Sequence, residues 1–510
     1  MAPRNFRRSG TRRKALIVTP KAPLTVTLVT ISAALLCAAP VAAQTVKVDG
    51  GEINGKKWNE STVFRGIPFA QPPLGPLRWK PPQPVRPWKG IRPSLDQPAS
   101  CLQNDYGWNH GDVLIGNEDC LTLDVRTPSL AGKLPVLVWI HGGSNRAGGP
   151  NDIVLSDVGK QVVIVGVRYR LGIFGFLSHR RLTAEQGASG NYGLMDQLAA
   201  LKWVKRNIAR FGGDPKNITI AGESAGSQDV SLALLEPGAR GLFQRAIMES
   251  GTPGFGMRFR SLHEAEAVGA ETDTLLNTGG DIAQLRQVPA RDLLAADLKL
   301  HDPGAPDDSF LWLRTTIDGK AIPRDPRRLL AEAPAKPIII GSNRFEFGLG
   351  GGHAERDRFI AEAFGMRASQ ARAVYRLDRP DPAADPRLGT RDEQIATDVI
   401  FRCPAQRFAT VMAAKGAPVW NYEFDAAPNG GKSSHAGEIA YAFGDSKLAH
   451  GLSLKPYWLN FMQTGNPNGD SLPPWPRFER DKPAHALFTD SGLAPLGALR
   501  PEVCSLLDTI

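Results

Sequence analysis

The sequence predicts an α/β fold in which a mostly parallel central sheet is flanked by helices, and three observations support this. Residues 135–140 and 161–167 are short, nearly continuous apolar runs, as is typical of strands buried on both faces of a parallel sheet. Apolar residues between 194 and 208 recur at steps of three and four, which indicates an amphipathic helix. Residues 217–221 form another strand-like run, which leads into a glycine-flanked serine and a helix-compatible segment. Strands that alternate with helices build a sheet with helices on both faces.

The remaining chain adds strands, a loop and a helical region. Residues 335–341 and 418–424 are apolar runs that predict two later strands. The proline-rich segment 71–87 cannot be a central strand, because proline lacks the N–H that a sheet needs, and we expect a surface loop. Residues 255–335 carry helical patterns and few sheet signals. No low-complexity linker divides residues 44–510, so the sequence predicts one large domain rather than several.

The positive charge of the chain belongs mainly to its N-terminus. The 510 residues have a formal net charge of +10, from 61 basic and 51 acidic side chains. Seven of the basic residues and no acidic residue lie in 1–43, so the rest of the chain is close to neutral. We therefore expect no nucleic-acid partner, since such binding requires a basic surface on the folded domain.

Residues 1–43 have the pattern of a cleavable signal peptide. A basic segment precedes the apolar stretch Leu24–Cys37, and small residues at Val41 and Ala43 fit cleavage between Ala43 and Gln44. The alternative is an uncleaved membrane anchor, but the apolar stretch is shorter than the roughly 20 residues that span a bilayer. We expect a secreted or periplasmic protein with no stable membrane insertion after cleavage. The export route, Sec or twin-arginine, and the oligomeric state stay open.

Loss of Cys37 with the signal peptide leaves an even number of cysteines, which suits an exported protein. They are Cys101, Cys120, Cys403 and Cys504. Four cysteines allow three pairings, and spacing does not choose among them. No Cys-x-x-Cys or paired His/Cys spacing indicates a metal site.

The segment Gly222-Glu223-Ser224-Ala225-Gly226 indicates a catalytic serine. A serine between two glycines, at a tight turn from a strand into a helix, is the arrangement called a nucleophile elbow. The turn leaves no room for large side chains beside the serine and holds it in a strained conformation with its hydroxyl exposed. The helix that follows points its N-terminal N–H groups toward that hydroxyl, which favours negative charge there.

Other motifs occur in a fixed order along the chain. They are Phe64–Ala70, Glu118–Val125, His141–Gly143, Arg168–Gly172, Gly190–Gln197, Gly213–Pro215 and Thr464–Asn468. With the elbow, they make the chain resemble the type-B carboxylesterase family, the cholinesterase-like branch of the α/β-hydrolases. The resemblance runs from Phe64 nearly to the C-terminus. It implies an α/β-hydrolase fold with helical lid and gorge insertions, to which residues 255–335 contribute.

The resemblance also implies a Ser-Glu-His triad in the chain order of α/β-hydrolases. A serine hydroxyl needs a base, and the base needs an orienting carboxylate. His435 lies in a segment similar to the family's histidine segment and is the expected base. Glu346 falls on the family's catalytic glutamate, although Phe345 and Phe347 replace the Asp and Gly that usually flank it. Should Glu346 fail, the remaining candidates are Asp398 and Asp425, which lie in no matching motif.

The glycine-rich loop after residue 140 is where the family has its oxyanion loop. Backbone N–H groups of Gly143 and Ser144, together with that of Ala225, are the expected oxyanion hole. The family usually has Gly or Ala where Ser144 stands and an aromatic residue where Asn145 stands. From this departure we derive the hypothesis that Asn145 and Arg146 favour a polar or anionic acyl group.

Further roles are implied by the same resemblance. Ser250 is similar to a family serine that hydrogen-bonds near the triad. Glu223, beside the nucleophile, is expected to form a buried ion pair with Arg65 or Arg168. The implied disulfides are Cys101–Cys120 and Cys403–Cys504.

These observations predict a serine carboxylic-ester hydrolase that acts on a small ester with a short or polar acyl group and needs no cofactor. An amidase or acyltransferase on the same site is one alternative. A non-catalytic cholinesterase-like binding module is another, although such proteins generally lose the nucleophile or the base. A lipase would need a large apolar lid, and residues 255–335 are not conspicuously apolar.

Overall fold

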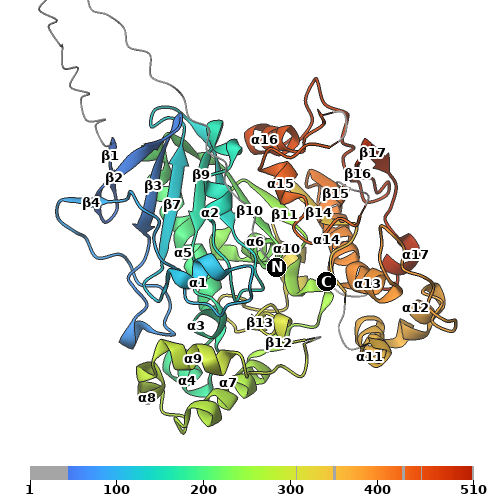
Figure 1. Cartoon of the computed structure of the whole chain (residues 1–510), viewed down its shortest axis with the longest axis horizontal. Coiled ribbons are helices and arrows are strands. Elements are labelled where there is room, and N and C mark those ends of the chain that lie inside the picture. The colour runs from blue at the N-terminus through green and yellow to red at the C-terminus, as the bar shows by residue number, and fades with distance from the viewer. Residues whose placement is uncertain (1–43, 306, 349–351, 428–430, 449–450, 508–510) are drawn as a thin grey trace, which may run out of the picture. The chain divides into compact units, whose positions relative to one another are not determined.

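The fold is built around one large mixed sheet (Figure 1). The computed structural model describes residues 44–305, 307–348, 352–427, 431–448 and 451–507. The predicted signal peptide, residues 1–43, lies outside the described residues. In spatial order the sheet contains β1 (Gln44–Val48), β2 (Gly51–Trp58), β3 (Ser61–Pro68), β7 (Thr122–Thr127), β9 (Val163–Val167), β8 (Leu134–Ile140), β10 (Gly213–Glu223), β11 (Arg245–Glu249), β14 (Ile338–Asn343), β15 (Val419–Asp425), β16 (His485–Thr489) and β17 (Gly492–Leu496).

The centre of this sheet is parallel and its two edges are antiparallel. Strands β9, β8, β10, β11, β14, β15 and β16 pair in parallel, whereas β1, β2, β3 and β7 meander antiparallel at one edge and β17 pairs antiparallel with β16 at the other. The short strand β4 (Ile91–Pro93) adds to β2. Two small pairs lie apart from the sheet: β5 (Ser100–Cys101) with β6 (Gly116–Asn117), and β12 (Arg260–Ser261) with β13 (Thr316–Ile317). The predicted α/β class with a mostly parallel central sheet is confirmed.

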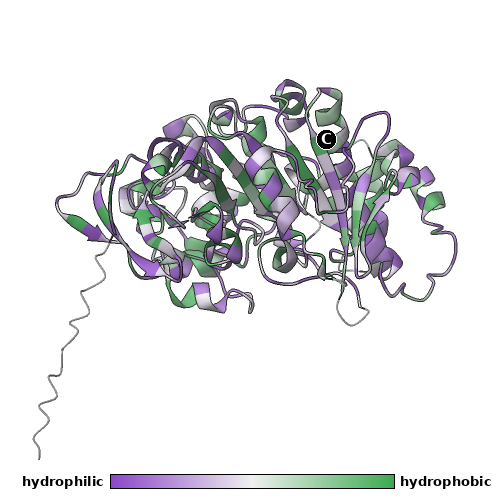
Figure 2. Cartoon of the chain, turned by 90° about the horizontal axis from the view of Figure 1, so that it is seen from above, coloured by the Kyte–Doolittle hydropathy of each residue, from purple (hydrophilic) through white to green (hydrophobic). Residues whose placement is uncertain are grey.

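Helices cover both faces of the sheet, and the side-chain alternation of β8 shows how. Its residues Val136, Val138 and Ile140 belong to one hydrophobic core, and Leu137 and Trp139 belong to another on the opposite face. Hydrophobic residues are frequent in strands at the centre of the molecule, whereas hydrophilic residues dominate many outer loops (Figure 2). The helices are α1 (His110–Leu114), α2 (Asn151–Val154), α3 (Gly172–Phe176), α4 (Arg180–Gln186), α5 (Tyr192–Asn207), α6 (Ala225–Leu235), α7 (Leu262–Leu276), α8 (Ile282–Gln287), α9 (Ala290–Asp297), α10 (Pro326–Glu332), α11 (Gly352–Phe364), α12 (Ala368–Val374), α13 (Arg391–Ala396), α14 (Cys403–Ala414), α15 (Ile439–Ala442), α16 (Lys455–Thr464) and α17 (Pro501–Cys504).

The elements expected from the sequence are present. The apolar runs become β8, β9, β14 and β15, and the amphipathic pattern becomes α5, whose continuation in a 3₁₀ turn ends before Gly212. The proline-rich segment 71–87 contains one 3₁₀ turn and no strand. The described part of residues 255–335 forms α7 to α10, and its only strands are the two-residue β12 and β13. Within the described residues, no helix has the length and apolar character needed to cross a bilayer.

Both disulfides implied by the resemblance are formed. Cys101 pairs with Cys120, and Cys403 pairs with Cys504. The first closes the loop that carries α1, and the second joins α17 to the start of α14.

Candidate active site

Ser224 occupies the turn between β10 and α6, as the sequence predicts. β10 ends at Glu223 and α6 begins at Ala225. The serine backbone has φ 55° and ψ −124°, a conformation that a non-glycine residue holds only under strain from its surroundings. A side chain on Gly226 would clash with the carbonyl oxygen of Ile140, and a Cβ on Gly222 would lie 2.7 Å from the same oxygen. The close approach of β8 therefore requires glycine on both sides of the turn.

The three residues of the expected triad follow the carboxyl ends of strands in the parallel part of the sheet. Ser224 follows β10, Glu346 follows β14 and His435 lies in the loop after β15. This edge of an open α/β sheet is where ligands bind in folds of this kind.

Glu346 and His435 are in direct contact. The histidine Nδ1 lies 2.6 Å from Glu346 Oε2. The other carboxylate oxygen, Oε1, accepts a hydrogen bond from the backbone N–H of Asn343 at 2.7 Å. The backbone N–H of Glu346 itself donates to Thr397 Oγ1 at 3.3 Å. These contacts fix the carboxylate, so that it orients the imidazole and stabilises the Nδ1–H tautomer.

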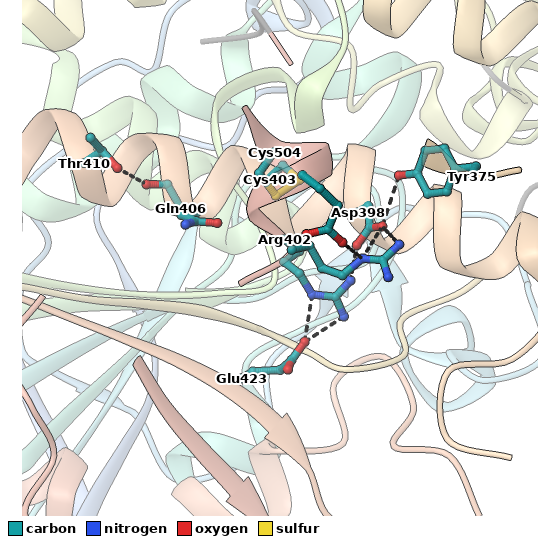
Figure 3. Close-up of a disulfide and its surroundings, with 10 residues drawn as sticks. Tyr375, Asp398, Arg402, Cys403, Gln406, Thr410, Glu423 and Cys504 are labelled. Atoms are coloured by element: carbon teal, nitrogen blue, oxygen red, sulfur yellow. Dashed lines mark hydrogen bonds and ion pairs between the residues drawn. A yellow bond between two sulfur atoms is a disulfide. The ribbon is translucent and has the colours of Figure 1, made fainter. Parts of the chain in front are cut away.

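The alternative acids make other contacts. Asp398 accepts hydrogen bonds from Tyr375, Arg402 and Arg500, as Figure 3 shows for the labelled pair Tyr375 and Arg402. Arg402 in turn pairs with Glu423. Asp425 pairs with Arg344 and Arg387. Both carboxylates are thus engaged with arginines, and Glu346 is the candidate acid that contacts His435.

The expectation that Glu223 pairs with Arg65 or Arg168 is wrong. Its Oε1 lies 3.2 Å from Nε2 of His435, whereas Arg65 and Arg168 both pair with Asp124, at 3.5 and 3.0 Å. The reason is the fully buried Asp124 carboxylate on β7. This carboxylate requires compensating charge and takes up both guanidinium groups. Glu223, at the end of β10, faces the histidine instead.

The acidic surroundings of His435 change the pKa values of the site. Burial lowers the pKa of His435, but the carboxylates of Glu223 and Glu346 outweigh it and raise that pKa to about 9. Burial raises the pKa of Glu223 to about 8, although the positive charge of His435 acts in the opposite direction. Nε2 of the imidazole therefore faces Glu223, the residue that precedes the expected nucleophile.

A further buried carboxylate, Glu438, links the parts of the site, and the sequence reasoning assigned it no role. It accepts hydrogen bonds from Ser250 Oγ at 3.2 Å, from Asn343 Nδ2 at 2.7 Å and from the Tyr422 hydroxyl at 3.0 Å. Ser250 thus hydrogen-bonds beside the triad, as the resemblance implies. The sequence feature that could have identified Glu438 is its position three residues after His435, in the same motif.

Glu249 is a second carboxyl group that sequence reasoning missed. It is fully buried and accepts a hydrogen bond from Trp458 Nε1 at 2.9 Å. Burial and the nearby charge of Glu438 raise its pKa well above the usual value. Its backbone carbonyl accepts the N–H of Ser224 at 2.9 Å.

The glycine-rich loop lies against the elbow. A Cβ on Gly142 would lie 2.6 Å from the carbonyl oxygen of Glu223 and 3.1 Å from Ser224 Cβ. Gly143 and Ser144 both have positive φ, of 100° and 57°. The loop that carries the expected oxyanion donors is therefore adjacent to the nucleophile and to the start of α6.

Asn145 does not face the site. Its side chain is fully buried, donates to Asp229 Oδ1 at 3.3 Å and accepts from the Tyr169 hydroxyl at 3.3 Å. The side chain of Asn145 is therefore engaged in the core, and its backbone has a positive φ of 56°. The guanidinium of Arg146 lies over the ring of Tyr106, 4.1 Å from its centroid.

Two aromatic rings pack against the imidazole of His435. Phe347 and Phe401 lie 5.1 and 5.3 Å from the imidazole, measured between ring centroids, and 5.0 Å from each other. Phe255 packs edge-on against Phe401. Phe347 is one of the two residues that depart from the family pattern; the other, Phe345, lies under the ammonium of Lys432 at 3.9 Å. The departure thus adds an apolar surface beside the histidine.

The sheet order, the strand-to-helix serine and the histidine–glutamate contact define a hydrolase of the α/β-hydrolase fold. Comparison with known proteins agrees. The chain is similar to a PNB esterase structure, with a TM-score of 0.78 and 30% identity, over 91% of this chain and 99% of the other. It is also similar to a carboxylesterase of Geobacillus stearothermophilus, with a TM-score of 0.76 and 30% identity, over 91% of this chain and all of the other.

Sequence comparison identifies the family. Rabbit (Oryctolagus cuniculus) liver carboxylesterase 1 is 35% identical over 82% of this chain and 84% of its own length. Residues 42–495 match the model of the carboxylesterase family. The chain belongs to this family and is a carboxylic ester hydrolase.

Proposed function

We propose that the protein hydrolyses esters through an acyl-enzyme on Ser224, with His435 as general base and acid and Glu346 as the carboxylate that orients it. The contact between Glu346 and His435, at 2.6 Å and beside the strained serine, carries this proposal. No cofactor takes part.

The reaction has two halves. Ser224 Oγ attacks the ester carbonyl carbon while its proton passes to Nε2 of His435. The tetrahedral intermediate then collapses: the bond to the alcohol oxygen breaks, and His435 returns the proton to that oxygen. A water molecule then attacks the carbonyl carbon of the acyl-enzyme and gives a proton to Nε2 of His435. The bond between this carbon and Ser224 Oγ breaks, and His435 returns the proton to Oγ, which releases the acid and restores the serine.

The negative oxygen of each intermediate needs donors that are already in place. The backbone N–H groups of Gly143, Ser144 and Ala225 are the proposed donors, because the loop and the start of α6 both border Ser224. Each such donor contributes about 3 kcal/mol to transition-state stabilisation. Since these donors are backbone groups, a serine at 144 serves as well as a glycine.

Glu223 and Glu438 hold the histidine rather than react. In the protonated imidazole Nε2–H donates to Glu223, and in the neutral imidazole Nε2 is free to accept the serine proton. Glu438 joins Ser250, Asn343 and Tyr422 in one buried network behind the triad. Ser250 and Glu223 therefore act by positioning.

The substrate is a small ester with a short acyl group. Phe347 and Phe401 make the surface beside His435 apolar, which suits an alkyl or aryl portion of the ester. The proposal of a polar acyl group now depends on Arg146 alone. Comparison of kcat/KM for short alkyl esters and dicarboxylate monoesters tests it, and an unchanged ratio in Arg146→Ala contradicts it.

The protein is exported as one domain, residues 44–510, after removal of the signal peptide 1–43. The two disulfides support an oxidising compartment. N-terminal sequencing of the protein from the culture medium or periplasm tests this, with Gln44 as the expected first residue.

Hydrolysis of p-nitrophenyl acetate, butyrate and octanoate by the mature protein, beside Ser224→Ala, tests the function. We expect turnover of the short esters, a decline toward octanoate, and loss of activity in the variant by about 10⁴-fold or more. A folded wild-type protein without turnover supports the binding module. Faster turnover of a matched anilide than of the ester supports an amidase.

A further inference from the structure

A cavity lies between α5 and α6, and Ser224 is not among its lining residues. Its volume is about 220 Å³. Leu194, Leu198 and Leu201 line it from α5, at the four- and three-residue spacing that places them on one helix face. Leu232 and Ala233 line it from α6. Because an apolar cavity of roughly 150 Å³ holds one benzene, this one has room for a single ring or an alkyl group of similar size.

The polar part of the lining is Asp229 on α6 with Gln197 on α5. Asp229 is 1% exposed. Its Oδ2 accepts from Gln197 Nε2 at 2.6 Å and its Oδ1 from Asn145 Nδ2 at 3.3 Å. Burial raises the pKa of Asp229 to about 7, and the groups that favour its charged form are all neutral amides. Among the described residues, the carboxylate therefore has hydrogen bonds but no counter-charge, which is a costly arrangement for a buried charge.

The other two charged residues of the lining, Lys320 and Glu236, are already engaged. Lys320 donates from Nζ to the carbonyl of Gln186, and Glu236 accepts the N–H of Gly238 at 2.8 Å. One is positive and one negative, so they offset each other. Asp229 is thus the lining residue whose charge is not compensated.

We propose that this cavity binds a small apolar amine, with its hydrocarbon part between α5 and α6 and its ammonium group on Asp229. The ammonium has three donors, and a carboxylate has about four acceptor positions, of which the two amides occupy two. The leucine side chains bury the hydrocarbon part. The bound amine then supplies the counter-charge that Asp229 lacks.

The position of the cavity connects it to the reacting serine. Asp229 lies five residues after Ser224 on the same helix. Its other contact, Asn145, follows Gly143 and Ser144 in the oxyanion loop. The amine therefore binds a carboxylate that also holds this loop.

Isothermal titration of the Ser224→Ala protein with benzylamine tests the proposal, because this variant removes any dependence on hydrolysis. Benzyl alcohol is the neutral probe of the same size. We expect one saturable site that binds benzylamine at least about tenfold more tightly than benzyl alcohol, since a hydrogen bond to a charged group contributes about 1.5–3 kcal/mol. Asp229→Asn should remove this preference without weakening benzyl alcohol.

Two further variants on the same background separate the cavity from other positions. Leu198→Trp fills the cavity and should remove binding of both probes, and Glu236→Gln at the mouth should change the affinity by less than about twofold. Thermal unfolding confirms that each variant is folded. The proposal is overturned if benzylamine does not bind, if Asp229→Asn leaves its affinity unchanged, or if Glu236→Gln weakens it as much as Asp229→Asn.

Discussion

The elbow and the histidine region of this site are built in different ways. At the elbow, five consecutive residues carry the motif that positions Ser224, because Gly222 and Gly226 have no space for a side chain beside one another and beside the end of β8. Around His435, the geometry depends on carboxylates and aromatic rings from distant parts of the chain, among them Glu223, Glu346 and Phe401. The first region is a local motif, and the second is a product of tertiary packing.

The difference shows where the family pattern can change. The elbow and its glycines match the pattern without exception, whereas Phe345 and Phe347 flank the acid in place of Asp and Gly. Substitution is tolerated there because hydrogen bonds with Asn343 and Thr397 hold the acid in place. The two phenylalanines make contacts of their own, Phe345 with Lys432 and Phe347 with His435. Changes to the two regions should therefore have effects of different kind and size.

The largest effect on activity is expected from Glu346→Gln, which removes the carboxylate that contacts His435. The amide cannot stabilise the imidazolium or fix the required tautomer, so kcat should fall by about 10⁴-fold. The initial rate with p-nitrophenyl butyrate measures this. Asp425→Asn is the matched control and should retain activity within about threefold. Comparable losses in both variants would mean that Glu346 is not the acid of the triad.

Removal of each disulfide should lower the stability of the protein by a different amount. Cys403 and Cys504 are 101 residues apart and adjoin the segment that carries Phe401, whereas Cys101 and Cys120 are 19 apart, on the side of the oxyanion loop. Replacement of both cysteines by serine should cost about 4–5 kcal/mol for the late pair and about 3 kcal/mol for the early pair. Urea unfolding measures both values. A larger loss of stability on removal of Cys101–Cys120 than of Cys403–Cys504 would contradict the expectation that the longer loop gives the greater stabilisation.

Gly226→Ala should distort the turn at Ser224 by a steric clash alone. The added methyl group would clash with the carbonyl oxygen of Ile140, which the sheet holds in place. We expect a loss of stability of about 3 kcal/mol, measured by thermal unfolding. Gly241→Ala is the control, because nothing lies within 4 Å of a Cβ there. A Gly226→Ala protein as stable as this control would disprove the close approach of β8.

The smallest effect, a change of pH dependence, is expected from Glu223→Gln. The negative charge of Glu223 stabilises the imidazolium and contributes to the raised pKa of His435, about 9. Its removal lowers that pKa, so that the neutral, basic form of His435 persists to lower pH. The acidic limb of the kcat/KM profile should move to lower pH. A limb that stays in place, or moves to higher pH, would show that Glu223 does not face the histidine.

The sequence predicts the local features of this molecule well and its long-range contacts less well. The strands, the amphipathic helix α5 and the elbow depend on periodicity and glycine sterics, which are visible within a few residues. The partner of Glu223 was wrong because charge pairing depends on which buried group competes, and Asp124 takes both arginines. The direction of the Asn145 side chain depends on its positive φ, which the residue type alone does not reveal. Glu438 and Glu249 were missed because their hydrogen-bond partners come from elsewhere in the sequence.

The most direct test of the proposed mechanism is to locate the covalent adduct formed with diethyl p-nitrophenyl phosphate. Peptide mass spectrometry of the labelled mature protein should find one diethylphosphoryl group on Ser224, with loss of ester hydrolysis in proportion to labelling. The rate of labelling should fall in Glu346→Gln, because the histidine no longer activates the serine. An adduct on another residue, or full labelling with hydrolysis intact, would contradict the mechanism.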